Sequence, residues 1–419
     1  MNISTEIKTF NFNVGLKVGV ISDSQLPPFS GSKGGAYKKN LLLSLEGLKK
    51  AGCNFIIFAG DIGNLSSRFA LKTYKGALDS VYKDCPVITQ TVMGNHDYYS
   101  PFRTPEMCRK LFSSVFSQSP YTHYVVNGFH FIGASPDCSS MTDGYSKMLP
   151  WLKEQIEIAV KDSKTKPIFV TTHNSALNTV YGSDDWGDKG IYDLFKNHPN
   201  IVNLSGHLHY SLLDERSFHQ NDYTTLGTQS ISYTEMEKGK ANGTVPPNAY
   251  MTPMGYIFDF REKDIVVRRM NFLNGIEEKA GRQPHIPYSV TKADLKSDLF
   301  NDTLPSMPSK TGEFKILANN ITALCFDAGT DNDFIHSYKI LYNDGTEQLY
   351  FSDFYNGIEN MQKKVILPLY AKAAGMYNIK VFALNSYGRV SENCTEINNV
   401  EIKKETRYWK KYSPEIKSL

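Results

Sequence analysis

Five short polar blocks constrain this chain more than any other feature of its sequence. Each block directly follows a hydrophobic, β-rich run, and each offers Asp, Asn, Gln or His side chains. The blocks are SDSQ at residues 22–25, GD at 60–61, GNHD at 94–97, TTH at 171–173 and SGHLH at 205–209. One such block alone carries no information, but five in this order, each at the end of a predicted strand, indicate a single polar cluster that holds metal.

The segment that contains the blocks, residues 16–271, alternates between apolar strands and amphipathic helices. The periodicity predicts strands at 17–21, 55–59, 87–92, 168–171 and 201–204, and helices at 37–50, 67–82, 104–116, 148–161 and 189–196. Asn127 and Gly128 predict a type I′ hairpin turn, and further strand pairs are predicted near 212–226 and 256–270. Early βαβα units followed by hairpins predict an α/β domain whose sheets lie under helices.

The polar side chains of the blocks should meet at one edge of a sheet. In an open, largely parallel sheet, the ligand crevice lies outside the carboxyl ends of the strands. Six side chains fall just past predicted strands: Asp23, Asp61, Asn95, His173, His207 and His209. Carboxylate, amide oxygen and imidazole groups suit divalent ions such as Mn, Fe or Zn rather than a metal that selects thiolates. Gly60, Gly94 and Gly206 would let the backbone come close to such a site.

As an ordered set, the blocks resemble the calcineurin-like metallophosphoesterase superfamily, whose pattern runs D-x-H, GD, GNH-[DE], H and GH-x-H. The resemblance spans residues 16–270. It implies a four-layer α/β/β/α fold, a double β-sandwich flanked by helices, with two divalent metal ions (Mn, Fe or Zn) at the rim. It also implies an enzyme, a metal-dependent phosphatase or phosphodiesterase that hydrolyses ester bonds.

The resemblance assigns a role to each polar residue of the blocks. Asp61 would bridge the two metals. One metal site would be completed by Asp23, Gln25 and His209, and the other by Asn95, His173 and His207. His96 would face the leaving-group oxygen as a general acid, and Asp97 would orient His96 from behind.

Gln25 departs from the family pattern, which has His at this position. Its side-chain oxygen can ligate a metal, although it is a weaker donor than imidazole. Two interpretations stay open: either Gln25 is a ligand that shifts metal affinity or preference, or that metal has lost a ligand and a water replaces it. We favour ligation, because Gln25 stands at the expected spacing from Asp23.

The resemblance also implies a mechanism, because a phosphate ester is anionic and repels hydroxide. Two metals about 3.5–4 Å apart lower the pKa of a bridging water and neutralise the phosphoryl oxygens. The resulting hydroxide attacks phosphorus in line, and His96 protonates the leaving alkoxide. The substrate would be a phosphomonoester or a small phosphodiester, walled by residues 25–35, 98–103 and 181–188. Arg103 is a weaker candidate for a phosphate contact, and residues 181–188 are either a substrate lid or a plain acidic loop.

The C-terminal part of the chain has a different character. Residues 274–311 contain many breakers and are interpreted as a linker or a partly ordered arm. Residues 312–404 alternate with short turns, which predicts an all-β sandwich, and the run Y-x-I-x-V-x-A-x-N-x-x-G from Tyr377 resembles the penultimate strand of fibronectin type III domains, with Tyr377 as the tyrosine-corner residue. The predicted organisation is therefore a metallophosphoesterase domain at 1–273, the linker, the sandwich at 312–404 and a tail at 405–419.

Composition bounds the remaining alternatives. A formal net charge of +3 over 419 residues, without a basic stripe, argues against nucleic-acid binding and against a nuclease of the same superfamily. No apolar run approaches the ~20 residues of a membrane span. Six scattered cysteines without a CxxC pair argue against a disulfide framework. The start of the chain lacks the pattern of a signal peptide. We expect a cytoplasmic enzyme, or a secreted one if the sequence is trimmed.

Other functions of the chain stay open at this point. A catalytically weak metal-binding or interaction module, with a degenerate first site at Gln25, is the alternative to the phosphohydrolase. The C-terminal sandwich would cover the cleft, mediate homo-oligomerisation or bind a partner. The other histidines are interpreted as surface or core residues: His123, His130, His198, His219, His285 and His336.

Overall fold

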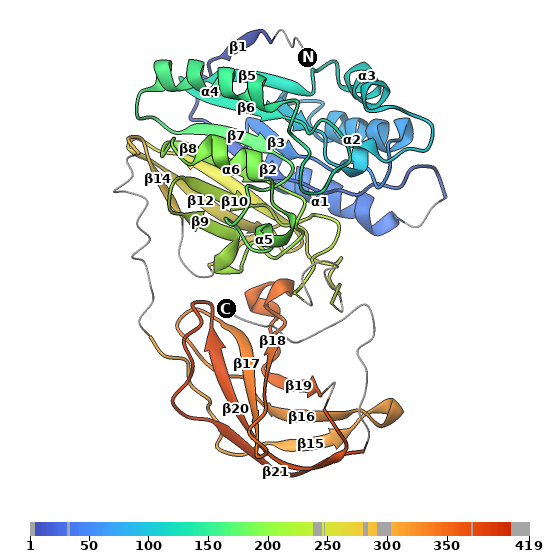
Figure 1. Ribbon diagram of the computed structural model, residues 1–419, viewed down its shortest axis with the longest axis vertical. Coiled ribbons are helices and arrows are strands. Elements are labelled where there is room, and N and C mark those ends of the chain that lie inside the picture. The colour runs from blue at the N-terminus through green and yellow to red at the C-terminus, as the bar shows by residue number, and fades with distance from the viewer. Residues whose placement is uncertain are drawn as a thin grey trace.

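Two seven-stranded sheets form the N-terminal part of the protein (Figure 1). The structure is a computed structural model and describes residues 5–31, 34–237, 245–246, 248–279, 284–290, 303–369 and 372–403. The first sheet contains β1 (Ile7–Phe10), β5 (Tyr121–Val126), β6 (Phe129–Ala134), β7 (Ile168–Thr172), β8 (Ile201–Ser205), β10 (Thr224–Gly227) and β9 (Phe218–Gln220), in that spatial order. The second contains β13 (Ile276–Glu277), β12 (Asp264–Asn271), β11 (Met254–Phe260), β2 (Lys17–Ile21), β3 (Phe55–Ala59) and β4 (Ile88–Val92), and β14 (His285–Pro287) also pairs with β12.

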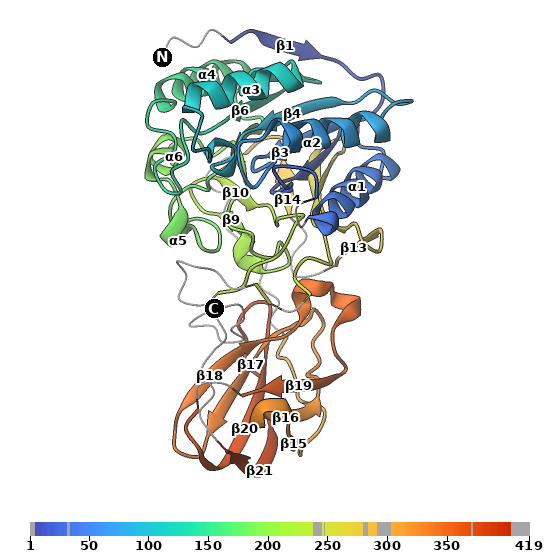
Figure 2. The same ribbon diagram turned by 90° about the vertical axis from the view of Figure 1, so that its right-hand side faces the viewer.

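Helices cover the outer face of each sheet, as Figure 2 shows from the side. α1 (Gly35–Lys50), α2 (Arg68–Val81) and α3 (Pro105–Phe116) pack on the second sheet, and α4 (Leu149–Ser163) and α6 (Lys189–Phe195) on the first. α5 (Ser183–Trp186) is a single turn, and the 3-10 helices are η1 (His96–Tyr98), η2 (Glu215–Ser217), η3 (Ala318–Asn320), η4 (Phe354–Asn356) and η5 (Ile358–Asn360). None of the helices in the described ranges has the length and apolar character that a membrane crossing needs.

Strand β3 shows why the sheets form separate layers. Its side chains alternate, so that Phe55 and Ile57 enter the core between the two sheets while Ile56 and Phe58 enter the core under the helices. All five of its residues are buried, which is the pattern of a strand covered on both faces. The predicted four-layer α/β/β/α fold is confirmed.

Most predicted elements lie within a few residues of their predicted bounds. The hairpin turn is confirmed, since Asn127 and Gly128 both have positive φ, 48° and 78°. Strand β1 and helix α5 were not predicted, because each is only four residues long and too short for periodicity to show. β13 and β14 extend the second sheet into residues 274–311, so part of the predicted linker is ordered on the sheet. The domain bounds stay a prediction, and residues 405–419 lie outside the described ranges.

The C-terminal part is the predicted all-β sandwich. One sheet has the order β15 (Glu313–Ile316), β16 (Thr322–Asp327) and β19 (Lys364–Pro368), and the other the order β18 (Glu347–Phe351), β17 (Ile335–Tyr342), β20 (Gly375–Asn385) and β21 (Thr395–Ile402). Tyr377 lies on β20 and its hydroxyl donates to the carbonyl of Ala373 at 3.1 Å, the upstream backbone bond that a tyrosine corner makes. The fibronectin type III assignment itself stays a prediction.

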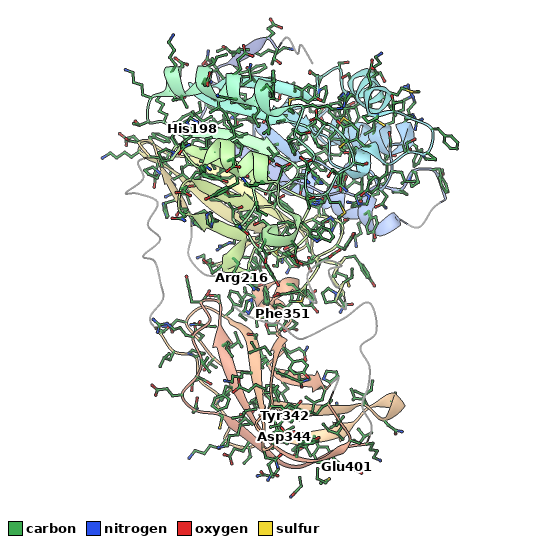
Figure 3. All side chains as sticks on the ribbon, in the orientation of Figure 1. His198, Arg216, Tyr342, Asp344, Phe351 and Glu401 are labelled. Atoms are coloured by element: carbon green, nitrogen blue, oxygen red, sulfur yellow. The ribbon has the colours of Figure 1, made fainter. Side chains whose placement is uncertain are left out.

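Direct contacts join the sandwich to the N-terminal part. Arg216 and Phe351 lie on opposite sides of this boundary in Figure 3, and Phe334, Phe351 and Phe354 pack into the same apolar cluster as Leu212 and Leu213. At the boundary, the Ile358 amide donates to Glu278 at 3.1 Å. His336 Nε2 donates to the buried Asp214 carboxylate at 2.9 Å.

Candidate metal centre

The five polar blocks lie at one rim because the strands before them run in parallel. β2, β3 and β4 pair in parallel in the second sheet, and β6, β7 and β8 do so in the first. Their carboxyl ends therefore point the same way, and the two face-to-face sheets bring both sets of ends together.

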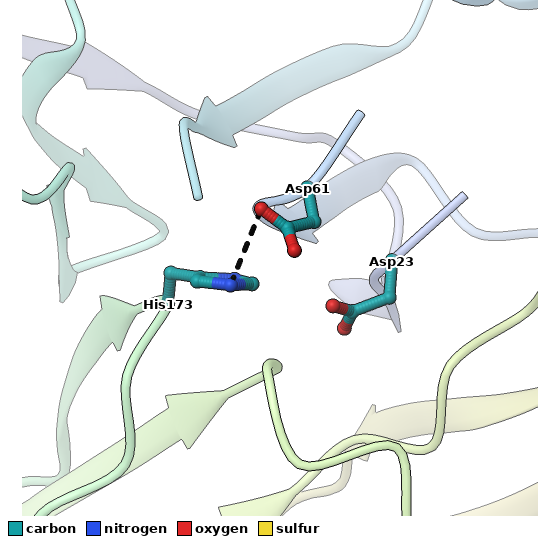
Figure 4. A group of neighbouring side chains, drawn as sticks. All are labelled: Asp23, Asp61 and His173. Atoms are coloured by element: carbon teal, nitrogen blue, oxygen red, sulfur yellow. Dashed lines mark ion pairs between the residues drawn. The ribbon is translucent and has the colours of Figure 1, made fainter. Parts of the chain in front are cut away.

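Asp61 stands at the centre of the cluster (Figure 4). Its Oδ1 lies 3.4 Å from His173 Nε2, and one ligand atom from each of Asp23, Asp61 and His173 lies within 4.8 Å of the others. His173 Nε2 is also 3.0 Å from Asn95 Oδ1, and His209 Nε2 is 3.2 Å from Asp23 Oδ1. The side chains that could donate to a metal thus form two pairs, Asp23 with His209 and Asn95 with His173, which we call the donor pairs. Asp61 lies next to both.

The backbone at the rim is held in strained conformations. Five residues of the blocks have φ in the left-handed region: Asp23 (54°), Gln25 (46°), Asp61 (55°), His207 (74°) and His209 (59°). Such conformations cost on the order of 1–3 kcal/mol each and persist where the surroundings fix them, typically at functional sites. The predicted role of two glycines is confirmed: a Cβ on Gly94 would lie 2.1 Å from Asp61 Oδ1, and one on Gly206 would lie 2.5 Å from Asp23 Oδ2.

Three buried polar atoms at the rim have no hydrogen-bond partner among the residues that the structure describes. They are Gln25 Oε1, His207 Nε2 and His209 Nδ1. An unpaired buried polar atom costs about 1–3 kcal/mol, so three in one cluster indicate that another group normally completes it. Oxygen and imidazole nitrogen donors around two carboxylates are the set that Mn, Fe or Zn prefers. The residues present therefore fit divalent metal ions.

The charges within the cluster are coupled. Burial alone would raise the pKa of Asp61, but the imidazoles of His173 and His96 hold it well below its ordinary value. Burial opposes a charged His173, yet the Asp61 charge outweighs it and raises the pKa of His173 to about 9. Burial lowers the pKa of His207 to about 3, which keeps this imidazole neutral, the form in which histidine binds metal.

His96 is held by a group that the sequence did not point to. Its Nδ1 lies 3.0 Å from the carbonyl of Asn64, so Nδ1 carries a proton and Nε2 is the free ring atom. The Asp97 carboxylate instead accepts the backbone amides of Ile62, Gly63 and Gly94 at 3.2, 3.1 and 2.9 Å. Asp97 thus ties the segment after Asp61 to Gly94, and the His96 ring nitrogen contacts the Asn64 carbonyl. The predicted role of Asp97 in orienting His96 stays a prediction.

Gln25 faces the centre of the cluster. Its Nε2 donates to Asp61 Oδ2 at 2.9 Å, and Oε1 is buried with no partner in the described part of the chain. Arg103, in contrast, donates from Nη1 to the carbonyl of Ser66 at 2.8 Å and so supports a neighbouring loop.

Three aromatic residues beside the cluster complete its surroundings. Trp186 lies within the predicted 181–188 wall, and Tyr99 within the predicted 98–103 wall. Tyr99 also accepts a hydrogen bond from Asn95 Nδ2 at 2.9 Å. Tyr233 had no sequence signal, because it reaches the rim through a loop after β10 in which Ser230 bridges to Ser22.

Residues 16–211 match the family model of the calcineurin-like phosphoesterases. Residues 16–211 are a calcineurin-like phosphoesterase domain. The match covers the five blocks and both layers of sheet that carry them, so this phosphoesterase domain belongs to the class of metal-dependent phosphoesterases, as the sequence predicted.

Solved structures that are similar to this chain share little sequence with it. A dimetal phosphatase from Danio rerio is 12% identical over 65% of this chain and 99% of its own, with a TM-score of 0.47. The purple acid phosphatase PPD1 from yellow lupin is 10% identical over 69% and 57%, with a TM-score of 0.47, and GAP50 of Plasmodium is 14% identical over 68% and 95%, with a TM-score of 0.40. No curated protein sequence matches this chain significantly.

Proposed function

We propose that the chain hydrolyses phosphate esters, phosphomonoesters or small phosphodiesters, with the help of two divalent metal ions. One observation carries the proposal: two donor pairs, Asp23 with His209 and Asn95 with His173, flank the buried Asp61 carboxylate. One ion would be held by Asp23, Gln25, Asp61 and His209, and the other by Asp61, Asn95, His173 and His207. Bound ions of this kind supply positive charge to the phosphoryl oxygens and activate a water.

The protein's own residues supply the proton for the leaving group. Because Asn64 fixes Nδ1 of His96, the free Nε2 is the atom that can donate a proton to the leaving oxygen. Nε2 lies 3.9 Å from Asp61 Oδ2, and the side chain is 32% exposed, so it faces both the cluster and the solvent from which it is reprotonated. Asp97 keeps this arrangement rigid through the backbone amides that it accepts.

The proposal is tested by comparing how much a His96 substitution slows the hydrolysis of esters with different leaving groups. Wild-type enzyme with Mn²⁺, Zn²⁺ or Fe²⁺ should hydrolyse p-nitrophenyl phosphate, bis(p-nitrophenyl) phosphate or methyl phosphate, and chelation should abolish the activity. His96→Gln should lower kcat by about 10²-fold or more for methyl phosphate, whose alkoxide needs a proton, and by much less for p-nitrophenyl phosphate, whose phenolate does not. Wild-type activity that is absent with every metal and ester would overturn the proposal, and an equal loss for both esters would remove His96 as the acid.

The role of Gln25 is tested by metal content. If Oε1 is a ligand, Gln25→Ala should reduce bound metal from two equivalents towards one, and Gln25→His should raise the affinity of that site by about tenfold, because imidazole is the better donor. Equilibrium dialysis followed by elemental analysis measures both. Gln25→Ala that retains two equivalents would show that Gln25 serves only to anchor Asp61.

A further inference from the structure

Three aromatic rings border the proposed metal centre, each against a different histidine. The ring centroid of Tyr99 is 4.5 Å from that of His96, Trp186 is 5.5 Å from His207, and Tyr233 is 4.5 Å from His209. The rings come from separate segments: Tyr99 follows η1, Trp186 ends α5, and Tyr233 follows β10. We call these three residues the ring frame. Convergence of three distant segments on one rim requires the tertiary fold and is not a local sequence effect.

The ring frame remains open to a ligand. All three side chains are half-buried, so each has a face or edge in contact with solvent. Within the described ranges, the Trp186 indole N–H and the Tyr233 hydroxyl make no hydrogen bond, although both groups are strong polar donors. A ring that served only packing would be covered, and its polar atom would usually be paired.

The surroundings hold two of the rings in place. Trp186 packs against the small cluster of Val180, Leu208 and Tyr210. The turn after it requires Gly187, because a Cβ there would lie 2.5 Å from Leu177 Cα. Tyr233 lies 6.3 Å from the ring of Tyr37, and its amide donates to Ser230 Oγ, which itself donates to the Asp23 carbonyl at 3.0 Å. Both rings are therefore fixed relative to the metal ligands before any substrate arrives.

The arrangement of the rings selects among ligand chemistries. No two of the three are in ring contact with each other, so they do not close into the cage that a quaternary ammonium group requires. They stand beside His96, His207 and His209. A phosphate bound at the proposed metal centre would therefore carry a flat group, attached through oxygen, against one of the rings. A nucleic-acid strand would also need a basic groove, which a net charge of +3 without a basic stripe does not provide.

We propose that the substrate is a phosphate ester whose organic part carries an aromatic or heteroaromatic ring, bound against the ring frame. This rests on the proposed phosphoesterase function and names the substrate class of the same site. Stacking or edge contact with a fixed aromatic ring adds to affinity beyond the area that it buries. The Trp186 N–H and Tyr233 hydroxyl would bind polar atoms on that ring.

The test compares benzyl phosphate with methyl phosphate, because their alkoxide leaving groups have similar basicity and differ in the ring. Wild type should prefer the benzyl ester in kcat/KM by about tenfold or more. Trp186→Leu and Tyr233→Leu should each reduce this preference several-fold, and Trp186→Phe, which keeps a ring, should retain most of it. Calorimetric binding of benzylphosphonate and methylphosphonate, which are not hydrolysed, should give the same order of preference.

Each outcome of the test bears on one proposal. Equal kcat/KM for the two esters in wild type, or an unchanged preference in both leucine variants, would overturn the ring frame and leave the proposed phosphoesterase function intact. If neither ester is hydrolysed, the proposed function fails, and the phosphonates alone decide whether the frame selects rings. A preference for phosphocholine over benzyl phosphate would also overturn the proposal, because it would show selection of a cation.

Discussion

Replacing Asp61 with asparagine should lower phosphate-ester hydrolysis by more than about 10³-fold and reduce bound metal below two equivalents per chain. Asp61 is the carboxylate that both donor pairs flank, and its low pKa keeps it ionised at neutral pH. The substitution keeps the size of the side chain and removes its charge. Loss of one preorganised charge-stabilising group already costs about 10²–10³ in rate, and this one is proposed to serve both metals.

Asparagine also disturbs the hydrogen bonds around position 61. The His96 amide donates to Asp61 Oδ1 at 2.9 Å, and Gln25 Nε2 donates to Oδ2 at 2.9 Å. An amide can accept on only one side, so one of these donors loses its partner, at a cost of about 1–3 kcal/mol. Domains usually have about 5–15 kcal/mol of stability, so most of the variant stays folded and unfolding cannot explain a 10³-fold loss.

Three measurements separate these effects. The rate is measured with saturating Mn²⁺ or Zn²⁺, the metal content by elemental analysis, and the stability by chemical unfolding in chelator. Asp79→Asn is the matched control, because Asp79 is 59% exposed on α2 and, among the described residues, pairs with Lys75 alone on the helix surface. Full metal content together with a rate within tenfold of wild type in Asp61→Asn would contradict the central role of this carboxylate.

The sequence predicted the location of the cluster because that location depends on strand direction. A residue just past a parallel strand lies at the rim whatever the details of packing, which holds for Asp23, Asp61 and His173 alike. The close approach at Gly94 and Gly206 also follows from the absence of a side chain. Such features are local and regular, so the order of elements and the polar blocks were enough to predict them.

The details that the sequence missed all depend on contacts between distant segments. Asn64 binds His96 through its backbone carbonyl, which no side-chain pattern can reveal. Asp97 accepts amides from the neighbouring loop because the two loops are packed together. Tyr233 reaches the rim only because the strand before it pairs with β8, and the amide orientation of Gln25 is set by Asp61. Sequence patterns predict which residues lie at the rim, and tertiary packing determines which contacts each side chain makes there.

The contact between His336 and Asp214 is another detail that sequence patterns do not reveal, because it joins two parts of the chain 122 residues apart. His336 on β17 is fully buried and was interpreted as a surface or core residue. Its Nε2 donates to Asp214 Oδ2 at 2.9 Å, while Arg216 Nε and Nη2 donate to the same carboxylate at 3.0 and 2.8 Å. Burial would raise the pKa of Asp214, but Arg216 and His336 hold it far below its ordinary value. Asp214 lies five residues after His209, so this bond ties the sandwich to the segment that carries a proposed metal ligand.

Replacing His336 with phenylalanine should therefore lower the free energy of unfolding by about 3 kcal/mol at pH 7, because it removes one partner of a buried charged contact. Phenylalanine keeps the packing against Phe354 and Phe351, which lie 4.8 and 5.5 Å from the His336 ring, so the loss reports the hydrogen bond rather than a cavity. Chemical unfolding measures it, with His285→Phe as the control, because the His285 side chain is 48% exposed. Equal unfolding midpoints for His336→Phe and wild type would show that the contact contributes nothing.

The same contact predicts how stability depends on pH. Because the folded pKa of Asp214 lies below its unfolded value of about 3.9, its contribution is complete above pH ~4 and is lost as the pH falls further, since the unfolded chain then binds the proton first. Wild type should lose about 1.4 kcal/mol per pH unit from this residue below pH ~4. Asp214→Asn has no proton to bind at this position, so its unfolding free energy should fall less steeply in acid while being lower at pH 7. Parallel acid slopes for wild type and Asp214→Asn would mean that other carboxylates carry the acid sensitivity and that Asp214 is not held ionised by His336 and Arg216.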